Sequence, residues 1–216
     1  MTTQTIKVGI CGLGTVGQGV IALLSEGGDV LSNRVGGTIE LVHVATRTPK
    51  PGVDTLGARD SRDVFDVARD PNVNVLIELI GGTTVAKELV VEALNHGKHV
   101  VTANKALLAD HGDELFTLAE SKGVALRFEA AVAGGIPVIE AVKTSLAGNH
   151  VSSVAGIING TGNFILTEMA AKGREFSDVL AEAQALGYAE ADPTFDVDGT
   201  DAAQKLVLLA SLAFGA

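Results

Sequence analysis

The sequence predicts an α/β fold: a doubly wound parallel sheet followed by a second domain of α+β type. Short apolar runs alternate with amphipathic stretches over residues 6–129, which is typical of βαβ units and a parallel sheet. A Gly-x-Gly-x-x-Gly motif directly follows the first apolar run. Small aliphatic residues dominate the 216-residue chain, and aromatic residues make up 4% of it. In such a fold, ligands bind beyond the carboxyl ends of the strands.

The first element is the apolar run 6–11, which predicts a buried strand. A glycine motif follows it, and an amphipathic helix is expected over residues 16–25. The glycines permit a tight turn, a close approach of backbone to a pyrophosphate and close helix–strand packing, while the helix N-terminus attracts phosphates. A glycine-rich turn without a ligand is the alternative. The predicted dinucleotide-binding residues are Gly12, Leu13, Gly14, Thr15, Val16 and Gly17.

The second strand, expected over residues 39–45 after a loop flanked by glycines, indicates which dinucleotide is bound. Sites for NAD usually carry an acidic residue at the end of this strand, where it binds the ribose 2′-hydroxyl. This chain has Ala45-Thr46-Arg47 there, and the Arg47 guanidinium can bind a 2′-phosphate. We therefore expect NADP as the cofactor. If Arg47 is only a solvent-exposed loop arginine, NAD remains an alternative cofactor.

The remaining elements of the first domain alternate regularly. Helices are expected over 63–69, 84–95 and 107–122, and strands over 73–79, 99–102 and 124–129. Gly81 follows one of these strands and Lys105 follows the next. Both residues should therefore lie at the carboxyl edge of the sheet, near the cofactor. A loop lysine without a function is the alternative for Lys105.

The alternation stops near residue 130. We expect a dinucleotide-binding domain over residues 1–130 and a substrate domain over 131–216, with helices over 137–145, 161–172, 177–186 and 200–214 and a strand over 150–158. Five carboxylates lie between Glu190 and Asp201, and Lys205 follows one helical turn later. Asp201 and Lys205 should thus share a helix face, where the lysine can give a proton to an oxygen and the carboxylates can bind an ammonium.

The residues of this acidic stretch allow two other interpretations. An EF-hand loop aligned on Gly199 needs glutamate at its last position, which is Lys205, so the calcium match fails. A capped, solvated helix start with a weak surface ion pair remains an alternative. Upstream, the segment 160–163 is expected between a strand and a helix, with N–H groups free to bind an anion such as a carboxylate.

Composition excludes several classes of protein. The net charge of −10 argues against a nucleic-acid or anionic-membrane partner, which would need a basic patch. No apolar run reaches the ~18 residues of a membrane span, residues 1–5 do not resemble a signal peptide, and the single cysteine, Cys11, cannot form an internal disulfide. The five histidines lack zinc-ligand spacing, and no nucleophile elbow is present. We expect a cytoplasmic protein with a small-molecule substrate.

Taken together, five segments resemble homoserine dehydrogenases over essentially the whole chain: GLGTVG, TANKALLA, FEAAVAGGIPVI, INGTGNFIL and GYAEADPTFDVDGTDAAQKL. The resemblance implies a Rossmann-type domain and the reversible NAD(P)H-dependent reduction of L-aspartate 4-semialdehyde to L-homoserine, in threonine, methionine and isoleucine biosynthesis. It implies that Lys205 donates a proton to the aldehyde oxygen and that Lys105 contacts cofactor and substrate. The implied substrate-binding residues are Glu190, Asp196, Asp201, Gly160, Thr161, Gly187 and Tyr188.

The resemblance also implies a sodium site at Glu129, Val132, Gly134 and Ile136, although this stretch of small residues equally fits a tight domain crossover. It implies a homodimer for the full-length chain, and a C-terminal truncation here because family members continue past residue 216. Other amino-acid NAD(P) oxidoreductases, such as an aspartate dehydrogenase, and a non-catalytic NADPH-binding sensor are the alternatives. An aspartate-semialdehyde dehydrogenase is disfavoured, because it needs a catalytic cysteine away from the glycine loop.

Overall fold

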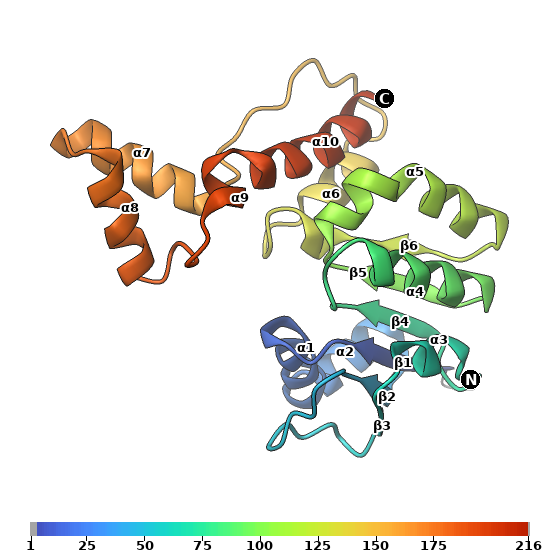
Figure 1. Ribbon diagram of the computed structural model, residues 1–216. Helices are drawn as coiled ribbons and strands as arrows, with labels where there is room; N and C mark the ends of the chain where they lie inside the picture. Colours follow the sequence, from blue (N-terminus) through green and yellow to red (C-terminus); the bar gives the residue numbers. More distant parts are fainter. Residues whose placement is uncertain (1–3, 216) are drawn as a thin grey trace. The chain divides into compact units, whose positions relative to one another are not determined.

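The computed structural model describes residues 4–215 (Figure 1). The chain divides into two units, Met1–Ala131 and Val132–Ala216. The first unit contains a six-stranded sheet in the order β3-β2-β1-β4-β5-β6, with every pair of neighbouring strands parallel. This is the order of a doubly wound dinucleotide-binding fold, and the chain reverses its direction of travel across the sheet between β1 and β4.

The elements of the first unit follow the predicted alternation. The strands are β1 (Gln4–Cys11), β2 (Gly37–Ala45), β3 (Arg59–Ser61), β4 (Val75–Glu78), β5 (His99–Thr102) and β6 (Leu126–Arg127). The helices are α1 (Thr15–Glu26), α2 (Gly28–Val35), α3 (Val64–Arg69), α4 (Thr84–Asn95) and α5 (Lys105–Ser121), and the 3₁₀ turn η1 (Glu129–Ala131) follows β6. The predicted α/β fold is confirmed, and α4 and β5 have the predicted bounds.

Two expectations for this unit are wrong, and one strand was not predicted. The loop expected before β2 contains the helix α2, with Asp29 in its first turn, Arg34 in its last turn and a left-handed Gly36 at its C-cap. Both charges stabilise the helix through its dipole. Two of the glycines that suggested a loop, Gly27 and Gly36, are the caps of this helix. The polar strand β3 has three residues and no apolar alternation, so the sequence gives no signal for it. Glu129 lies in η1 rather than in a strand, because β6 ends at Arg127.

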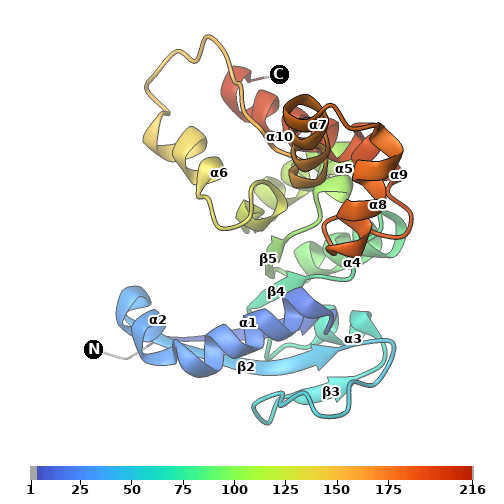
Figure 2. The same cartoon turned by 90° about the vertical axis from the view of Figure 1, so that its left-hand side faces the viewer.

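Helices cover both faces of the sheet. Val8 and Ile10 of β1 belong to a buried cluster with Ile21 of α1. The intervening Gly9 faces α3, because a Cβ at this position would overlap the side chain of Val67. Since successive strand residues point to opposite faces, α1 and α3 lie on opposite sides of the sheet. Figure 2 shows α1 running along the strands on the near side.

A polar cluster is buried near the amino ends of β4 and β5. His43 Nδ1 and Asp70 Oδ2 are 2.8 Å apart, and Asp70 Oδ1 accepts hydrogen bonds from the backbone N and side-chain Nδ2 of Asn72 at 2.8 and 3.1 Å. Lys98 Nζ donates to the carbonyl oxygens of Asp70 and Val73 at 2.5 and 2.8 Å. Burial raises the pKa of Asp70, but the hydrogen bonds from Asn72 and His43 outweigh it, so the pKa lies below its ordinary value. Burial lowers the pKa of Lys98.

This cluster makes stability depend on pH. A carboxyl group with a lowered folded-state pKa stabilises the fold above its unfolded pKa of about 4, and the contribution is lost as the pH falls through the folded pKa. Asp70→Asn is therefore expected to lower the free energy of unfolding at pH 5 by about 1–3 kcal/mol. Urea unfolding should show the difference between the two proteins shrinking as the pH falls through the lowered pKa of Asp70. A constant difference would contradict the assigned pKa direction.

The second unit is helical over residues 132–215. Its helices are α6 (Val138–Glu140), which continues as the π-helix η2 (Ala141–Ser145), α7 (Gly160–Lys172), α8 (Phe176–Ala185), α9 (Thr194–Val197) and α10 (Thr200–Phe214). The strand expected over 150–158 is not formed, because these residues lack regular structure and no other strand within 132–215 offers them a partner. No helix within residues 4–215 has both the length and the apolar character of a membrane span.

Helices α7 and α8 form a small core in this unit. Ile165 of α7 packs with Val179 and Ala183 of α8 and with Ala189. Arg174, in the connection between the two helices, forms ion pairs with glutamates of both of them. Apolar packing at the centre and the ion pairs of Arg174 at one end therefore hold the two helices together.

Candidate functional site

The carboxyl ends of the four central strands lie in one row. Ala45, Cys11, Glu78 and Thr102 are register partners across β2, β1, β4 and β5. The glycine motif follows β1 directly, at the point where the strand order reverses. This edge is where doubly wound folds bind ligands.

The glycine loop, residues 12–17, packs tightly against the protein at Gly12 and Gly17 and leaves open space at Gly14. Gly12 has a φ of +102°, and a Cβ there would overlap the carbonyl of Leu79. A Cβ on Gly17 would overlap the carbonyl oxygen of Gly12, so only glycine lets α1 approach the loop this closely. Gly14, the N-cap of α1, has no atom within 4 Å of its Cβ position. The open space in front of Gly14 and the helix N-terminus together fit a pyrophosphate.

The rest of the motif divides between core and surface. Leu13 is buried in the hydrophobic core, whereas Thr15 and Val16 are exposed in the first turn of α1. The Gly12 amide donates to the carbonyl oxygen of Ala45 at 2.8 Å, which links the loop to the end of β2. The loop and β2 are therefore fixed relative to each other.

Arg47 is exposed just beyond the end of β2. The backbone before it is held in place, because Arg62 Nη1 donates to the carbonyl oxygen of Thr46 at 3.1 Å. Arg62 also forms an ion pair with Asp60. Of these two arginines, Arg62 is engaged with its own loop, which leaves Arg47 as the better candidate for an added phosphate.

Gly81 and Lys105 lie after β4 and β5. Gly81 has a φ of +71°, and Lys105 is the first, half-buried residue of α5. Asn104 caps α5, because its Oδ1 accepts from Leu107 N at 3.1 Å, and its Nδ2 donates to the carbonyl oxygen of Gly82 at 2.7 Å. One asparagine therefore ties together the two loops that carry the predicted residues.

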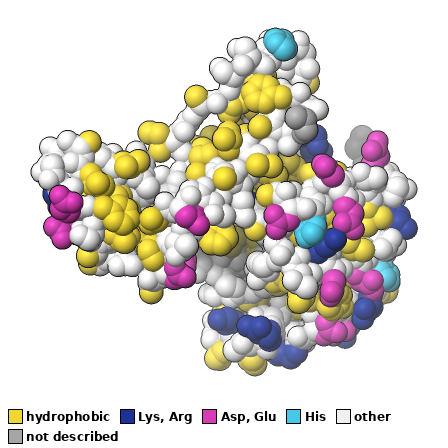
Figure 3. Space-filling model, turned by 45° about the horizontal axis from the view of Figure 1, so that its top comes forward, with side chains coloured by type: hydrophobic (Ala, Val, Ile, Leu, Met, Phe, Trp, Pro, Cys, Tyr) yellow, Lys and Arg dark blue, Asp and Glu magenta, His cyan; other side chains and the backbone are white. Residues whose placement is uncertain are grey.

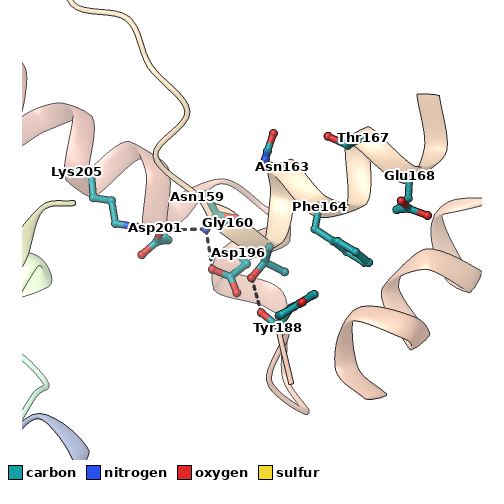
Figure 4. A pocket seen from close by; sticks show the side chains of 11 residues that line it. Asn159, Gly160, Asn163, Phe164, Thr167, Glu168, Tyr188, Asp196, Asp201 and Lys205 are labelled. Carbon is teal, nitrogen blue, oxygen red and sulfur yellow. Dashed lines mark hydrogen bonds and ion pairs between the residues drawn. The ribbon is translucent and has the colours of Figure 1, made fainter. Parts of the chain in front are cut away.

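The second unit contains a cavity of about 600 Å³ beside the start of α7 and the first turns of α10 (Figure 4). Six of the residues that we predicted for the substrate site line it: Gly160, Thr161, Tyr188, Asp196, Asp201 and Lys205. Asn159, Asn163, Phe164, Thr167 and Glu168 complete the lining. The cavity therefore combines three carboxylates, those of Glu168, Asp196 and Asp201, and the Lys205 ammonium with an aromatic wall.

Lys205 and Asp201 form the charged centre of this cavity. They are four residues apart on α10, and Lys205 Nζ lies 2.6 Å from Asp201 Oδ2. Lys205 also donates to the carbonyl oxygen of Ile158 at 2.7 Å. Their side chains are 19% and 11% exposed, so this pair is not a freely solvated surface ion pair. The lysine is held with its ammonium at the cavity.

Asn159 connects the carboxylates and was not recognised in the sequence. Its Nδ2 donates to Asp196 Oδ1 at 2.7 Å and to Asp201 Oδ2 at 2.9 Å, as Figure 4 shows. Its Oδ1 accepts from Gly162 N at 2.6 Å and so caps α7. The expectation of free N–H groups in segment 160–163 is therefore wrong for Gly162, and also for Asn163, whose N–H donates to the carbonyl oxygen of Asn159 at 3.1 Å. An asparagine directly before a helix start was the available signal for the cap.

The aromatic side of the cavity is formed by Phe164 and Tyr188. Their ring centroids are 5.1 Å apart in an edge-to-face arrangement. Thr161 Oγ1 donates to the carbonyl oxygen of Tyr188 at 2.6 Å, which fixes the segment after α8 against α7. The two rings give the cavity one apolar side.

Two predicted substrate residues do not line the cavity. Glu190 has an exposed side chain, and its carbonyl oxygen accepts from Gln184 Nε2 at 3.0 Å. Gly187 lies in the turn after α8 with a φ of +77°. Both are in the segment that leads into the acidic stretch, next to Tyr188 rather than facing Lys205.

Two other carboxylates of the acidic stretch accept hydrogen bonds from residues of their own turns. The side chain and backbone of Thr194 donate to Asp192 and lower the pKa of its carboxyl group. The backbone and side chain of Thr200 lower the pKa of Asp198 in the same way, at the start of α10. These groups shape the loop, which leaves Asp196 and Asp201 to face the cavity.

The residues expected to bind sodium lie in irregular backbone. Glu129 belongs to η1, and Val132, Gly134 and Ile136 follow in a series of turns. Ala133 and Gly135 have φ values of +52° and +84°, so the chain here forms neither a helix nor a strand that would occupy its carbonyls regularly. Among residues 4–215, no group of three or more His, Cys, Asp and Glu side chains is arranged to hold a metal ion.

Hydrophobic side chains are exposed on the second unit (Figure 3). Ile157, Leu166 and Phe176 are 77%, 67% and 40% exposed. They line a further cavity of about 370 Å³, in which Asp196 is the one charged residue of the described lining. An apolar lining of this kind does not suit a charged amino-acid substrate, so the cavity around Lys205 is the better candidate.

Comparison with known proteins identifies relatives of both units. Residues 12–129 match the family model for the homoserine dehydrogenase NAD-binding domain, and residues 137–216 match the model for homoserine dehydrogenase. A homoserine dehydrogenase from Pseudomonas aeruginosa is 60% identical over 98% of this chain and 49% of its own length. One from Neisseria gonorrhoeae is 50% identical over the same shares. The chain thus spans about half the length of these curated relatives.

Solved structures show the same likeness. A homoserine dehydrogenase from Thiobacillus denitrificans superposes with a TM-score of 0.94 at 50% identity, covering 99% of this chain and 50% of that one. A hyperthermophilic archaeal homoserine dehydrogenase in complex with NADPH has a TM-score of 0.85 at 26% identity, over 99% of this chain and 71% of that one.

Proposed function

Since the chain belongs to the homoserine dehydrogenase family, we propose that it supplies the cofactor-binding domain and the proton donor of an enzyme that interconverts L-aspartate 4-semialdehyde and L-homoserine. The observation that carries this proposal is the ammonium of Lys205, held 2.6 Å from Asp201 at a cavity that Asp196 also lines. A non-catalytic dinucleotide-binding protein would not need this arrangement. The reaction belongs to threonine, methionine and isoleucine biosynthesis.

The proposed cofactor is NADP, with NAD as the alternative. When bound, the reduced nicotinamide supplies a hydride to the aldehyde carbon. The loop 12–17 is proposed to hold the pyrophosphate, Ala45 and Arg47 to face the adenosine ribose, and Gly81 and Lys105 to lie beside the nicotinamide end. The archaeal relative solved with NADPH supports a phosphorylated dinucleotide.

Lys205 is proposed to complete the reduction. An ammonium has three N–H donors, and two of those on Lys205 bond to Asp201 and Ile158. The third can bond to the aldehyde oxygen, which becomes negatively charged as the hydride arrives at the adjoining carbon. Transfer of the Lys205 proton to this oxygen then yields the hydroxyl group of homoserine.

The carboxylates are proposed to recognise the amino group of the substrate. Asp196 and Asp201 face the cavity, where they can accept hydrogen bonds from an ammonium. Glu190 is proposed as a further partner from the exposed segment after α8. The polar atoms of Gly160, Thr161, Gly187 and Tyr188 are proposed to contact the rest of the substrate.

Further proposals rest on the family resemblance. The backbone around Val132, Gly134 and Ile136, together with Glu129, would hold a monovalent cation such as Na⁺; its turns with positive φ fit carbonyl ligands better than a helix would. Homodimer formation and a cytoplasmic location are proposed on the same ground.

The activity is tested with the full-length protein. L-homoserine and NADP should give a rise in the absorbance of reduced nicotinamide, and omission of either compound should abolish the rise. Tight NADPH binding without turnover would instead support a dinucleotide-binding sensor.

Arg47→Ala tests the cofactor preference. Loss of a charged hydrogen bond to a 2′-phosphate is expected to raise the Kd for NADPH by about tenfold or more. The Kd for NADH, which lacks this phosphate, should change little. Fluorescence titration of both cofactors measures the two values, with Arg34→Ala, an exposed arginine of α2, as the matched control for charge. Equal weakening of NADPH and NADH would contradict the phosphate assignment.

A further inference from the structure

Glu78 is a fully buried carboxylate at the carboxyl edge of the sheet. As the last residue of β4, it lies in register with Cys11 on one side and Thr102 on the other. Its Oε1 accepts from Ile80 N at 2.9 Å and from Gly81 N at 3.2 Å. This one oxygen therefore holds the turn that carries the left-handed Gly81.

The second carboxylate oxygen reaches the neighbouring loop. Thr102 Oγ1 lies 2.5 Å from Glu78 Oε2 and accepts from Asn104 N at 2.9 Å. Because the Asn104 amide can only donate, the single hydroxyl proton of Thr102 is left to point at Glu78. All three groups bonded to Glu78 are thus donors, which suits an ionised carboxylate because it only accepts.

Asn104 closes the network. Its side chain donates to the carbonyl oxygen of Gly82, in the turn that Glu78 holds, and caps the helix that begins at Lys105. The turn 80–82 and the start of α5 are therefore joined twice, through Glu78–Thr102 and through Asn104. Neither loop can shift without breaking a hydrogen bond of the other.

Apolar packing of the sheet does not require a carboxylate at position 78. Burying an ionised carboxylate has a large desolvation cost, and replacing buried charged groups by apolar residues is often neutral or stabilising. The neighbours of Glu78 in β4 are Val75, Leu76 and Ile77, which are the residues that a buried parallel strand favours. An aliphatic residue would serve the apolar packing of β4 as well, but it would leave the Ile80 and Gly81 amides and the buried Thr102 hydroxyl without their common acceptor. What Glu78 adds to the strand is therefore the fixing of these two loops.

We propose that Glu78 is a positioning residue: it holds the Gly81 turn and the start of α5 in the one arrangement in which Gly81 and Lys105 can meet the nicotinamide end of the cofactor. This inference rests on the proposed cofactor site. It assigns Glu78 no contact with the cofactor and no part in proton transfer.

Glu78→Gln in the full-length protein tests the proposal. Glutamine keeps the size of the side chain and one acceptor oxygen, but it presents an N–H₂ group to the turn or to Thr102. The Kd for NADPH, measured by fluorescence below the unfolding temperature of each variant, is expected to rise by about tenfold. The matched control is Asp70→Asn, which alters a buried carboxylate that precedes β4 and faces His43. Its Kd should stay within about twofold of the unsubstituted value, whatever its melting temperature.

A second pair of variants covers the case in which Glu78→Gln does not fold. Thr102→Val removes the hydroxyl at nearly constant volume and should raise the Kd for NADPH by about tenfold. Thr102→Ser keeps the hydroxyl and should restore the Kd to within about threefold of the original value. Equal Kd values for Thr102→Val, Thr102→Ser and the unsubstituted protein would overturn the positioning role, as would an equal loss of affinity in Asp70→Asn. If the unsubstituted protein does not bind NADPH, the proposed function fails, and the positioning role fails with it.

Discussion

Lys205→Ala is expected to lower kcat of the full-length enzyme by about 10²–10⁴-fold, the usual contribution of a positioned general acid. The alanine variant leaves the charge that develops on the aldehyde oxygen without its proton donor. It also leaves Asp201, whose side chain is 11% exposed, without its partner lysine. The Kd for NADPH should stay within about twofold, because the glycine loop belongs to the other unit. Steady-state assays and fluorescence titration of the same preparations measure the two quantities.

The matched control for this prediction is Lys172→Ala. Lys172 is also paired with a carboxylate four residues away on a helix of the same unit, but its side chain is 60% exposed and it does not line the cavity. Its kcat should be unchanged within about twofold, because exposed pairs contribute little. Normal turnover by Lys205→Ala would remove this lysine from the mechanism.

A pair of glycine substitutions should separate folding from cofactor binding. Gly17→Ala places a Cβ against the carbonyl oxygen of Gly12, so α1 must move away from the loop. The free energy of unfolding should fall by about 1–3 kcal/mol or more, as in other overpacked sites, and NADPH binding should be lost with the loop geometry. Gly14→Ala meets no atom within 4 Å and has a φ of −73° that alanine adopts freely. Its stability should change by less than about 1 kcal/mol.

Cofactor binding by Gly14→Ala should nevertheless be weak. The methyl group would occupy the open space where the pyrophosphate approaches, and the Kd for NADPH should rise by at least about tenfold. Urea unfolding and NADPH titration of both variants give the comparison. Unchanged affinity in Gly14→Ala would mean that the dinucleotide does not lie against this loop.

The sequence predicted the first unit well because its signals are local. The strand–glycine–helix junction at residues 6–17 and the apolar runs of the later strands each carry their own pattern. The errors occur where partners decide the structure. Residues 150–158 have strand-like composition, but the described residues 132–215 contain no strand for them to pair with. Helix α2 forms because Gly27 and Gly36 cap it and its terminal charges complement the helix dipole.

The candidate site was predictable to the extent that its residues are close in sequence. The spacing of Asp201 and Lys205 is one helical turn, so their pairing could be read directly. The bond from Asn159 to Asp201 spans 42 residues and depends on how α7 and α10 pack, which no local pattern encodes. Glu78 did leave a signal, since a carboxylate in the run VLIEL must be satisfied if the strand is buried.

The environment of Cys11 makes the chain suited to fluorescence work. It is the one cysteine in the sequence, it is buried at the end of β1, and burial together with Glu78 and Asp63 raises the pKa of its thiol. Maleimide dyes react with accessible thiolates, so the native thiol should stay unlabelled under conditions that modify an engineered surface cysteine. A single reporter dye could then be attached near Gly81 or on α7 without first removing the natural cysteine.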